Sequence, residues 1–352
     1  MNKIVSSTEL TFQLHRANKV VYNFTTSPLS LAVGDVNDDN QVDIVIGMFA
    51  TNEIYVLLNI GNGSFTLSNV YTAGVQLYAV TLTDLNGDTK LDIVIANGVN
   101  TSISVLLNNG NGTFASPMFY SCYSTPQAIA AGDLNGDGHI DIAVGHGGNP
   151  RMRIFFNLGN GSLSSPVDYV LSSGNAVQTA DVNQDNKTDI IFLSSSYLYI
   201  LPNNGNGTFT SIRYNVDNSP ESLATFDIND DNQLDIIVAA FNGDRVSVFL
   251  NHGNNTFTAQ ANYTVGARPK TVVAADVNGD NKPDIITANH NVGSVSVLFN
   301  NGDGTFAPYR NYAVGSTPYA AVAADVDGDN KLDIVVINYS SRNVGVLFNC
   351  FN

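Results

Sequence analysis

A nine-residue acidic loop recurs seven times along this 352-residue chain, at intervals of 46–49 residues. Each copy has Asp at positions 1, 5 and 9 and Asn or Asp at position 3. The copies span residues 35–43, 84–92, 133–141, 181–189, 227–235, 276–284 and 325–333. A self-similar period of this length indicates a stacked or circular array of one supersecondary unit. We therefore expect residues 1–352 to form one repeat domain.

Residues 271–312 illustrate the strand pattern within a unit. Residues 271–276 are a short strand of small residues that leads into the acidic loop, residues 284–288 are rich in β-branched side chains, and residues 294–299 alternate polar and apolar. Residues 300–306, Asn-Asn-Gly-Asp-Gly-Thr-Phe, then predict a tight turn before a fourth strand, because Asn and Gly tolerate positive φ. No helical periodicity is present. Four short antiparallel strands per unit predict an all-β, seven-bladed β-propeller, in preference to an α-solenoid or a β-helix.

The two ends of the chain predict how the ring closes. The seventh unit stops at residues 347–352, where its fourth strand should begin. Tyr22 lies thirteen residues before the first loop, which is the spacing of the tyrosine that ends the fourth strand in five other units. We therefore expect a strand within residues 10–24 to complete the blade formed by residues 320–352 and to leave no open sheet edge.

The acidic loops have the oxygen spacing of a calcium site. Calcium takes six to eight oxygen ligands from carboxylates and carbonyls, whereas magnesium keeps several waters. Positions 1, 3, 5 and 9 offer side-chain oxygens, and position 7 varies among Gln, Lys and His, which suits a backbone carbonyl ligand. An EF-hand is excluded because the closing acid falls at position 9 and no flanking helices are predicted. A plain acidic turn is the alternative, although three carboxylates in nine residues would repel one another without an ion.

We accordingly expect up to seven Ca²⁺ ions, each held by positions 1, 3, 5, 7 and 9 of one loop. The expected ligands are Asp35, Asn37, Asp39, Gln41, Asp43, Asp84, Asn86, Asp88, Lys90, Asp92, Asp133, Asn135, Asp137, His139, Asp141, Asp181, Asn183, Asp185, Lys187, Asp189, Asp227, Asn229, Asp231, Gln233, Asp235, Asp276, Asn278, Asp280, Lys282, Asp284, Asp325, Asp327, Asp329, Lys331 and Asp333. The last loop carries a fourth carboxylate, Asp327, and should bind tightest. Thr89 is β-branched where the other loops have Asn or Gly, so the second loop should bind weakest.

Charge and composition restrict the possible binding partners and the possible location of the protein. The net charge is −16, yet 21 of the 31 acidic residues occupy loop positions 1, 5 and 9, so the acidity is mostly ligand charge. The 15 Lys and Arg residues are too sparse for nucleic-acid binding, and no apolar run is long enough for a membrane span. The first residues lack the apolar stretch of a secretion signal, but ten Asn-x-Ser/Thr sequons and the calcium loops favour an extracellular or cell-surface protein. Cys122 and Cys350 fall in different units, and we expect free thiols rather than one bridge.

The pairing of this loop with the Asn-Gly-Thr-Phe turn resembles the FG-GAP/VCBS repeats, which form the calcium-loop blades of the integrin α-subunit head and of many extracellular proteins. The resemblance covers nearly the whole chain. It implies a seven-bladed propeller with a calcium site between the first and second strands of each blade. It also implies ligands at positions 1, 3, 5, 7 and 9 of each loop.

We expect the variable loops on the face opposite the calcium loops to form a recognition surface. The candidate residues on it are His146, Arg151, Phe241, Arg245, His290, Tyr339 and Arg342. The first expected function is a calcium-binding, non-catalytic adhesion module that binds another protein, as a monomer or as part of a larger extracellular protein. A calcium-dependent lectin is the second candidate and a propeller lyase the third.

Two sequence features weigh against these alternatives. Trp is absent, and Tyr and Phe fall mostly at strand positions, which argues against a lectin. The histidines, His15, His139, His146, His252 and His290, occupy unrelated positions in different units. No nucleophile, zinc or paired-acid motif occurs outside the acidic loops, which argues against an enzyme.

Overall fold

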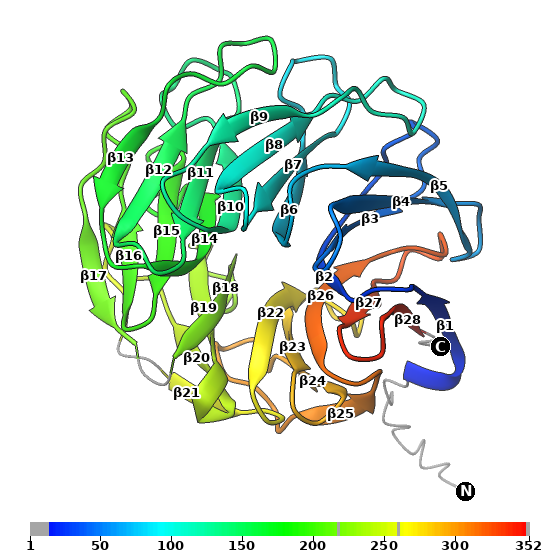
Figure 1. Cartoon of the computed structure of the whole chain (residues 1–352). Helices are drawn as coiled ribbons and strands as arrows, with labels where there is room; N and C mark the ends of the chain where they lie inside the picture. The colour runs from blue at the N-terminus through cyan, green and yellow to red at the C-terminus, as the bar shows by residue number, and fades with distance from the viewer. Residues whose placement is uncertain (1–13, 217–218, 259–260, 350–352) are drawn as a thin grey trace, which may run out of the picture.

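The computed structural model describes residues 14–216, 219–258 and 261–349. Seven four-stranded antiparallel sheets are arranged as blades around a central axis (Figure 1). The predicted all-β, seven-bladed β-propeller is confirmed. Within the described ranges the helical element is a single 3-10 turn, η1 (Phe241–Gly243), and no helix there could cross a membrane.

Each blade has the same order of strands from the axis outwards. The innermost strands are β2 (Pro28–Gly34), β6 (Leu77–Thr83), β10 (Pro126–Gly132), β14 (Gly174–Ala180), β18 (Pro220–Phe226), β22 (Pro269–Ala275) and β26 (Pro318–Ala324). The second strands are β3 (Asp43–Met48), β7 (Asp92–Asn97), β11 (Asp141–His146), β15 (Asp189–Ser194), β19 (Asp235–Ala240), β23 (Asp284–Asn289) and β27 (Asp333–Asn338). The third strands are β4 (Glu53–Asn59), β8 (Ser102–Leu106), β12 (Arg151–Phe155), β16 (Tyr197–Leu201), β20 (Arg245–Phe249), β24 (Ser294–Leu298) and β28 (Asn343–Asn349). The outermost strands are β5 (Phe65–Thr72), β9 (Met118–Ser121), β13 (Val167–Val170), β17 (Ile212–Asn215), β21 (Ala261–Thr264), β25 (Arg310–Ala313) and β1 (Leu14–Asn23).

The core lies between the blades and not within any one of them. Each second strand is buried along its full length, because both of its faces pack against a neighbouring blade. Val45 of the first blade and Ile93 of the second, for example, belong to one apolar cluster. Burial on both faces explains why these strands read as continuous runs of Ile, Val and Ala in the sequence. A single blade could not bury its own apolar faces, so stability depends on the closed ring.

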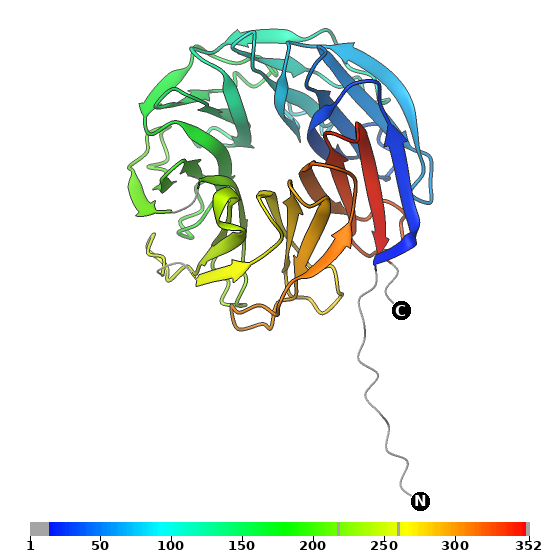
Figure 2. The ribbon, with the colours of Figure 1, turned by 60° about the horizontal axis from the view of Figure 1, so that its bottom comes forward.

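The ring closes through β1, which pairs antiparallel with β28 and completes the seventh blade. Figure 2 shows these two ends of the chain side by side, with β1 in blue and β28 in red. The hydroxyl of Tyr22 accepts the backbone N–H of Phe65 at 2.7 Å, as the hydroxyl of Tyr71 accepts that of Phe114 within the ring. The predicted closing strand is confirmed over Leu14–Asn23, while residues 10–13 and 350–352 of the predicted ranges lie outside the described residues.

Candidate metal centre and axial cavity

Each acidic loop joins an innermost strand to the second strand of its blade, and all seven loops are on one face of the ring. The Asp at position 9 is the first residue of the second strand and is completely buried in every blade. Positions 4 and 6 have positive φ, between 60° and 83°, in all seven loops. Asn, Asp and Gly adopt this conformation more readily than other residues, which explains their frequency at these positions. Thr89 adopts it too, at φ 69°.

The Asp at position 1 organises the loop around itself. In the first blade Asp35 Oδ1 accepts the backbone N–H groups of residues 37–39 at 2.7–3.2 Å, and its Oδ2 accepts that of Asn40 at 2.6 Å. Asp39 Oδ1 accepts the backbone N–H of Gln41 at 2.9 Å. The chain therefore wraps around two carboxylates. These bonds fix the positions of the two carboxylates within the loop.

The buried Asp at position 9 links the loop to the rest of its blade. Asp43 Oδ2 accepts the backbone N–H of Val36 at 2.9 Å, and its Oδ1 accepts that of Asn59 at 2.8 Å. Burial raises the pKa of Asp43 to about 6, against the lowering effect of these two bonds, and nearby Asp39 and Asp35 raise it further. Burial likewise raises the pKa of Asp284 and of Asp333 to about 7. A bound cation would offset the penalty of ionising these carboxyls.

The donor set fits a hard divalent cation. In the seventh loop one carboxylate oxygen from each of Asp325, Asp327 and Asp333 lies within 4.8 Å of the others. The side chains and carbonyls of the expected positions supply oxygen donors, which calcium and magnesium prefer to nitrogen or sulfur. Among the described residues, three acidic side chains meet in this way in the seventh loop, whereas the other six loops contain the expected residues without such a cluster. The residues present therefore fit the expected ion.

On the opposite face, aromatic side chains from five blades form a continuous chain of contacts, which we call the aromatic arc. It comprises Phe241, His290, Tyr319, Tyr339, Phe49 and Tyr78, with successive ring centroids 5.7–6.4 Å apart. Three of these residues, Phe241, His290 and Tyr339, are among the candidates for the recognition surface. The sequence argument against a glycan ligand loses its force, because the fold gathers aromatic residues that are far apart in the chain.

The expectation that His146 lies on the recognition surface is wrong. Its side chain is 2% exposed, and Nδ1 lies 3.3 Å from the carbonyl oxygen of Arg151. Burial lowers the pKa of His146. His146 ends the second strand of its blade, where the packing of neighbouring blades buries every residue.

The aromatic arc does not include the three arginine candidates. Arg151 is exposed and lies 3.6 Å from Asp168, while Arg342 donates to the carbonyl of Thr25 at 3.2 Å. Arg245 begins β20 and is half-buried. Of the two cysteines, Cys122 is a buried free thiol and Cys350 lies outside the described residues.

A cavity of about 530 Å³ lies on the axis and is lined by the innermost strands of all seven blades. Every innermost strand shifts register between its first and third residues, so its second residue sits on a β-bulge. These seven residues, which we call the bulge ring, are Leu29, Tyr78, Gln127, Asn175, Glu221, Lys270 and Tyr319. Sequence reasoning missed them. The signal was a position that follows a strand-initial Pro in five units and varies widely between units.

One protein-family model matches the chain repeat by repeat. The family model of the FG-GAP-like repeat matches residues 35–95, 84–144, 133–192, 181–238, 227–287 and 276–336. No curated protein matches the chain. The six matches begin at the first Asp of the first six acidic loops and extend into the next blade, so they follow the structural unit.

Similar solved structures share the propeller fold at low sequence identity. A lectin from Agrocybe aegerita that recognises non-reducing terminal N-acetylglucosamine is 20% identical, with a TM-score of 0.58 over 82% of this chain and 80% of the lectin. A catalytically inactive virginiamycin B lyase from Staphylococcus aureus, solved with quinupristin, is 13% identical, with a TM-score of 0.65 over 93% of this chain and 98% of the lyase. BBS1N, solved in complex with ARL6DN, is 14% identical, with a TM-score of 0.64 over 94% of this chain and 95% of that chain.

At these identities the solved structures show the fold alone. The family is shown by the repeat model, whose overlapping matches run without a gap from residue 35 to residue 336. The chain therefore belongs to the FG-GAP-like repeat family and forms a seven-bladed β-propeller.

Proposed function

We propose that this protein is a calcium-binding, non-catalytic interaction module that works outside the cell or at its surface. Seven loops bind calcium and hold the ring together, and the opposite face contacts the ligand. The observation that carries this proposal is the sevenfold loop. Each copy combines a buried Asp at the start of the second strand with acidic residues at positions 1 and 5.

An extracellular location would supply the calcium that such loops need. Calcium modules of extracellular proteins bind with Kd of roughly 10⁻⁴–10⁻³ M, which matches the calcium supply outside cells. A site at about tenfold excess over Kd adds about 1.4 kcal/mol to the free energy of unfolding. Seven such sites would add about 10 kcal/mol, similar to the whole stability of an ordinary domain, roughly 5–15 kcal/mol. Calcium would then decide whether the ring stays closed.

The side chains capable of catalysis support a non-catalytic role. Burial raises the pKa of the Cys122 thiol to about 12, so this group is protonated and unreactive near neutral pH. His146 is buried between blades, while His139 and His252 are exposed on the calcium face. His290 packs edge-on against Phe241 in the aromatic arc. Nδ1 of His146 lies 3.3 Å from the carbonyl oxygen of Arg151, and Nδ1 of His290 lies 3.1 Å from Oδ1 of Asn291, so neither contact pairs a histidine with a hydroxyl or thiol nucleophile.

The ligand of such a module is a protein or a glycan. Adhesion to a protein is the first candidate, because variable loops on a rigid ring suit a broad contact surface. A lectin is the second candidate. The aromatic arc favours it, since aromatic faces pack well against the apolar faces of sugars.

Thermal unfolding tests the calcium proposal. Melting temperatures are measured in millimolar calcium, in millimolar magnesium and in EGTA. We expect calcium to raise the melting temperature over EGTA by roughly 10–20 °C, and magnesium to raise it far less. Equal melting temperatures in calcium and EGTA would show that these loops are acidic turns without a metal.

A further inference from the structure

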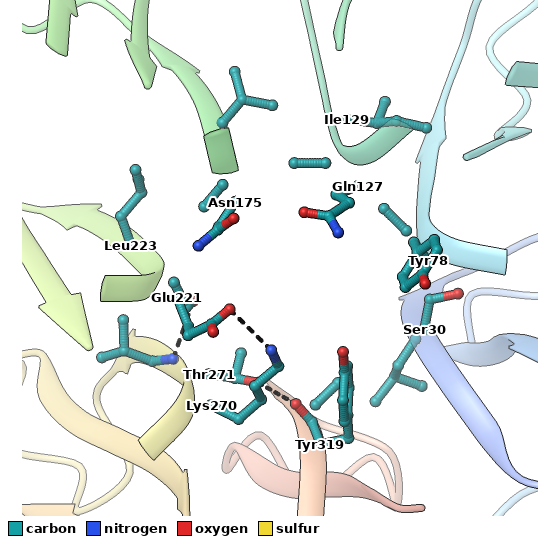
Figure 3. A pocket seen from close by; sticks show the side chains of 18 of the residues that line it. Ser30, Tyr78, Gln127, Ile129, Asn175, Glu221, Leu223, Lys270, Thr271 and Tyr319 are labelled. Atoms are coloured by element: carbon teal, nitrogen blue, oxygen red, sulfur yellow. Dashed lines mark hydrogen bonds and ion pairs between the residues drawn. The ribbon is translucent and has the colours of Figure 1, made fainter. Parts of the chain in front are cut away.

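The axial cavity combines features that the calcium loops do not explain. Its volume of about 530 Å³ lies within the range of small-ligand sites, roughly 300–1,000 Å³. It lies where the innermost strands begin, at the end of the axis opposite the calcium loops. Figure 3 shows Tyr78, Gln127, Asn175, Glu221 and Lys270 pointing into one shared space.

The bulge ring is a built feature of this cavity. A β-bulge leaves one residue out of the regular ladder and re-aims its side chain, and bulges are frequent beside functional sites. Here the bulge recurs in all seven blades, while the residue that it carries differs from blade to blade. The ring holds two phenols, two amides, one carboxylate, one ammonium and one leucine side chain. The backbone bulge is thus the same in all seven blades, while the side chain that it presents to the cavity differs between blades.

The charges in the ring cancel. Lys270 Nζ lies 2.9 Å from Glu221 Oε2, and also lies over the rings of Tyr319 and Phe241, 4.9 and 5.6 Å from their centroids. Burial by itself lowers the pKa of Lys270, but Tyr319 and Glu221 outweigh it, so the pKa is raised and the ammonium stays charged. Both side chains remain partly exposed, at 19% for Lys270 and 24% for Glu221. The pair therefore offers both an acceptor and a donor to the cavity without a net charge.

The residue after each second strand shapes the rim. It is aromatic in four blades, as Phe49, Phe241, His290 and Tyr339, and small in the other three, as Gly98, Gly147 and Ser195. A Cβ at Gly98 would collide with the ring of Tyr78, and one at Gly147 would collide with the amide of Gln127. These two glycines therefore leave room for Tyr78 and Gln127 in the positions observed. One side of the rim is therefore lined by aromatic side chains, whereas the other side has small residues that leave space for Tyr78 and Gln127.

We propose that the axial cavity binds one neutral saccharide ring. A sugar hydroxyl can donate to Glu221 and accept from Lys270 while their ion pair stays intact, and the amides of Gln127 and Asn175 both donate and accept. The apolar face of the sugar packs on the Tyr78 or Tyr319 ring. A phosphate or carboxylate ligand would instead lie beside Glu221 and compete with it for Lys270. This inference rests on the proposed binding role but not on the calcium sites, because none of the bulge-ring residues belongs to an acidic loop.

The test is a glycan array of defined saccharides with neutral, sialylated and uronic termini, probed with the full chain in millimolar calcium. Binding of the free methyl glycoside of each hit is then measured by calorimetry. We expect neutral termini to bind and the free glycoside to compete. We expect Tyr78→Ala and Gln127→Ala each to weaken binding about tenfold or more, equivalent to about 1.4 kcal/mol. Tyr309→Ala, at an exposed tyrosine outside the cavity, should leave the affinity unchanged.

Several results would overturn the proposal. These are a blank array, binding of charged termini alone, no competition by the free glycoside, or full affinity in both cavity variants. Circular dichroism and melting temperature establish that each variant is folded before it is scored. The calcium melts are a separate measurement, so loss of the calcium proposal and loss of the saccharide proposal are read independently.

Discussion

Asp43 Oδ1 accepts the backbone N–H of Asn59 at 2.8 Å, and this bond is the first step of a link between neighbouring blades. The side-chain amide of Asn59 donates to the carbonyl of Val326, in the acidic loop of the preceding blade, at 2.8 Å. The buried Asp of one loop is thus two hydrogen bonds away from the backbone of the loop in the preceding blade. A cation that orders one loop would also order its neighbour.

The same link is present in all seven blades. The asparagines that make it are Asn59, Asn108, Asn157, Asn203, Asn251, Asn300 and Asn349, and each donates to a carbonyl at loop position 2 of the preceding blade at 2.7–3.0 Å. The circuit is therefore continuous around the ring, including the seam. The seven loops are therefore linked to one another through buried hydrogen bonds and not only through the common fold.

Removing one link should destabilise the ring. Asn157 donates to the carbonyls of Leu85 and Ile140 at 2.7 and 2.9 Å, so Asn157→Ala leaves both buried acceptors without this donor. We expect a loss of about 2–4 kcal/mol in the free energy of unfolding, measured by denaturant titration in calcium. The control is Asn160→Ala in the same turn, where the side chain is exposed and accepts hydrogen bonds only from Ser162, so the loss should stay below about 1 kcal/mol. Equal losses for the two variants would contradict the link.

Relieving strain in the second loop should tighten calcium binding. Thr89 has φ 69°, a conformation that a β-branched residue adopts at a penalty of about 1 kcal/mol or more. In Thr89→Asn we expect the weakest step of a calorimetric calcium titration to tighten by about threefold to fivefold. The reverse change, Asn281→Thr at the same position of the sixth loop, should add a second weak step. An unchanged titration in both variants would refute the assignment.

The fourth carboxylate of the seventh loop should act in opposite directions with and without calcium. Asp327→Asn removes one ligand charge, so we expect calcium affinity at this loop to fall by roughly threefold to tenfold. Burial, together with Asp329 and Asp325, raises the pKa of Asp327, so the same variant should be slightly more stable than wild type in EGTA. Asn278→Asp in the sixth loop is the matched reverse change. The measurement is the melting temperature of each variant in calcium and in EGTA.

Stability should depend on pH in opposite ways in EGTA and in calcium. The pKa of Asp43 is raised to about 6, and the pKa values of Asp284 and Asp333 to about 7, against about 3.9 for an unfolded Asp. Between these values the folded state holds more protons, so stability falls as pH rises through about 4–7 in EGTA. Calcium needs the ionised carboxylates, so in calcium the melting temperature should rise over the same range. Melting curves from pH 4.5 to 8 check this, and parallel profiles in the two buffers would contradict it.

The features of this fold that could be predicted from the sequence are those contained within a single repeat. The turn at residues 300–306 is readable because its positive-φ positions, Gly302 and Gly304, carry glycine, and the second strands are readable because both faces are apolar. Tyr22 revealed the seam, since its spacing repeats that of Tyr71. Each of these signals depends on residues close together in the chain.

The sequence by itself determined the number of blades, the strand order, the closing strand and the positions of the acidic loops, because local backbone preferences and a fixed period encode them. Only the tertiary structure decided which side chains come into contact at the axis and between blades. Glu221 and Lys270 are 49 residues apart, and Asn157 and Leu85 are 72 apart, so closure of the ring brings them together. The same closure buries His146, because a strand end that looks like a surface loop in one unit is covered by the next blade. A single repeat specifies its own backbone, whereas contacts between different repeats depend on how seven unequal units share one axis.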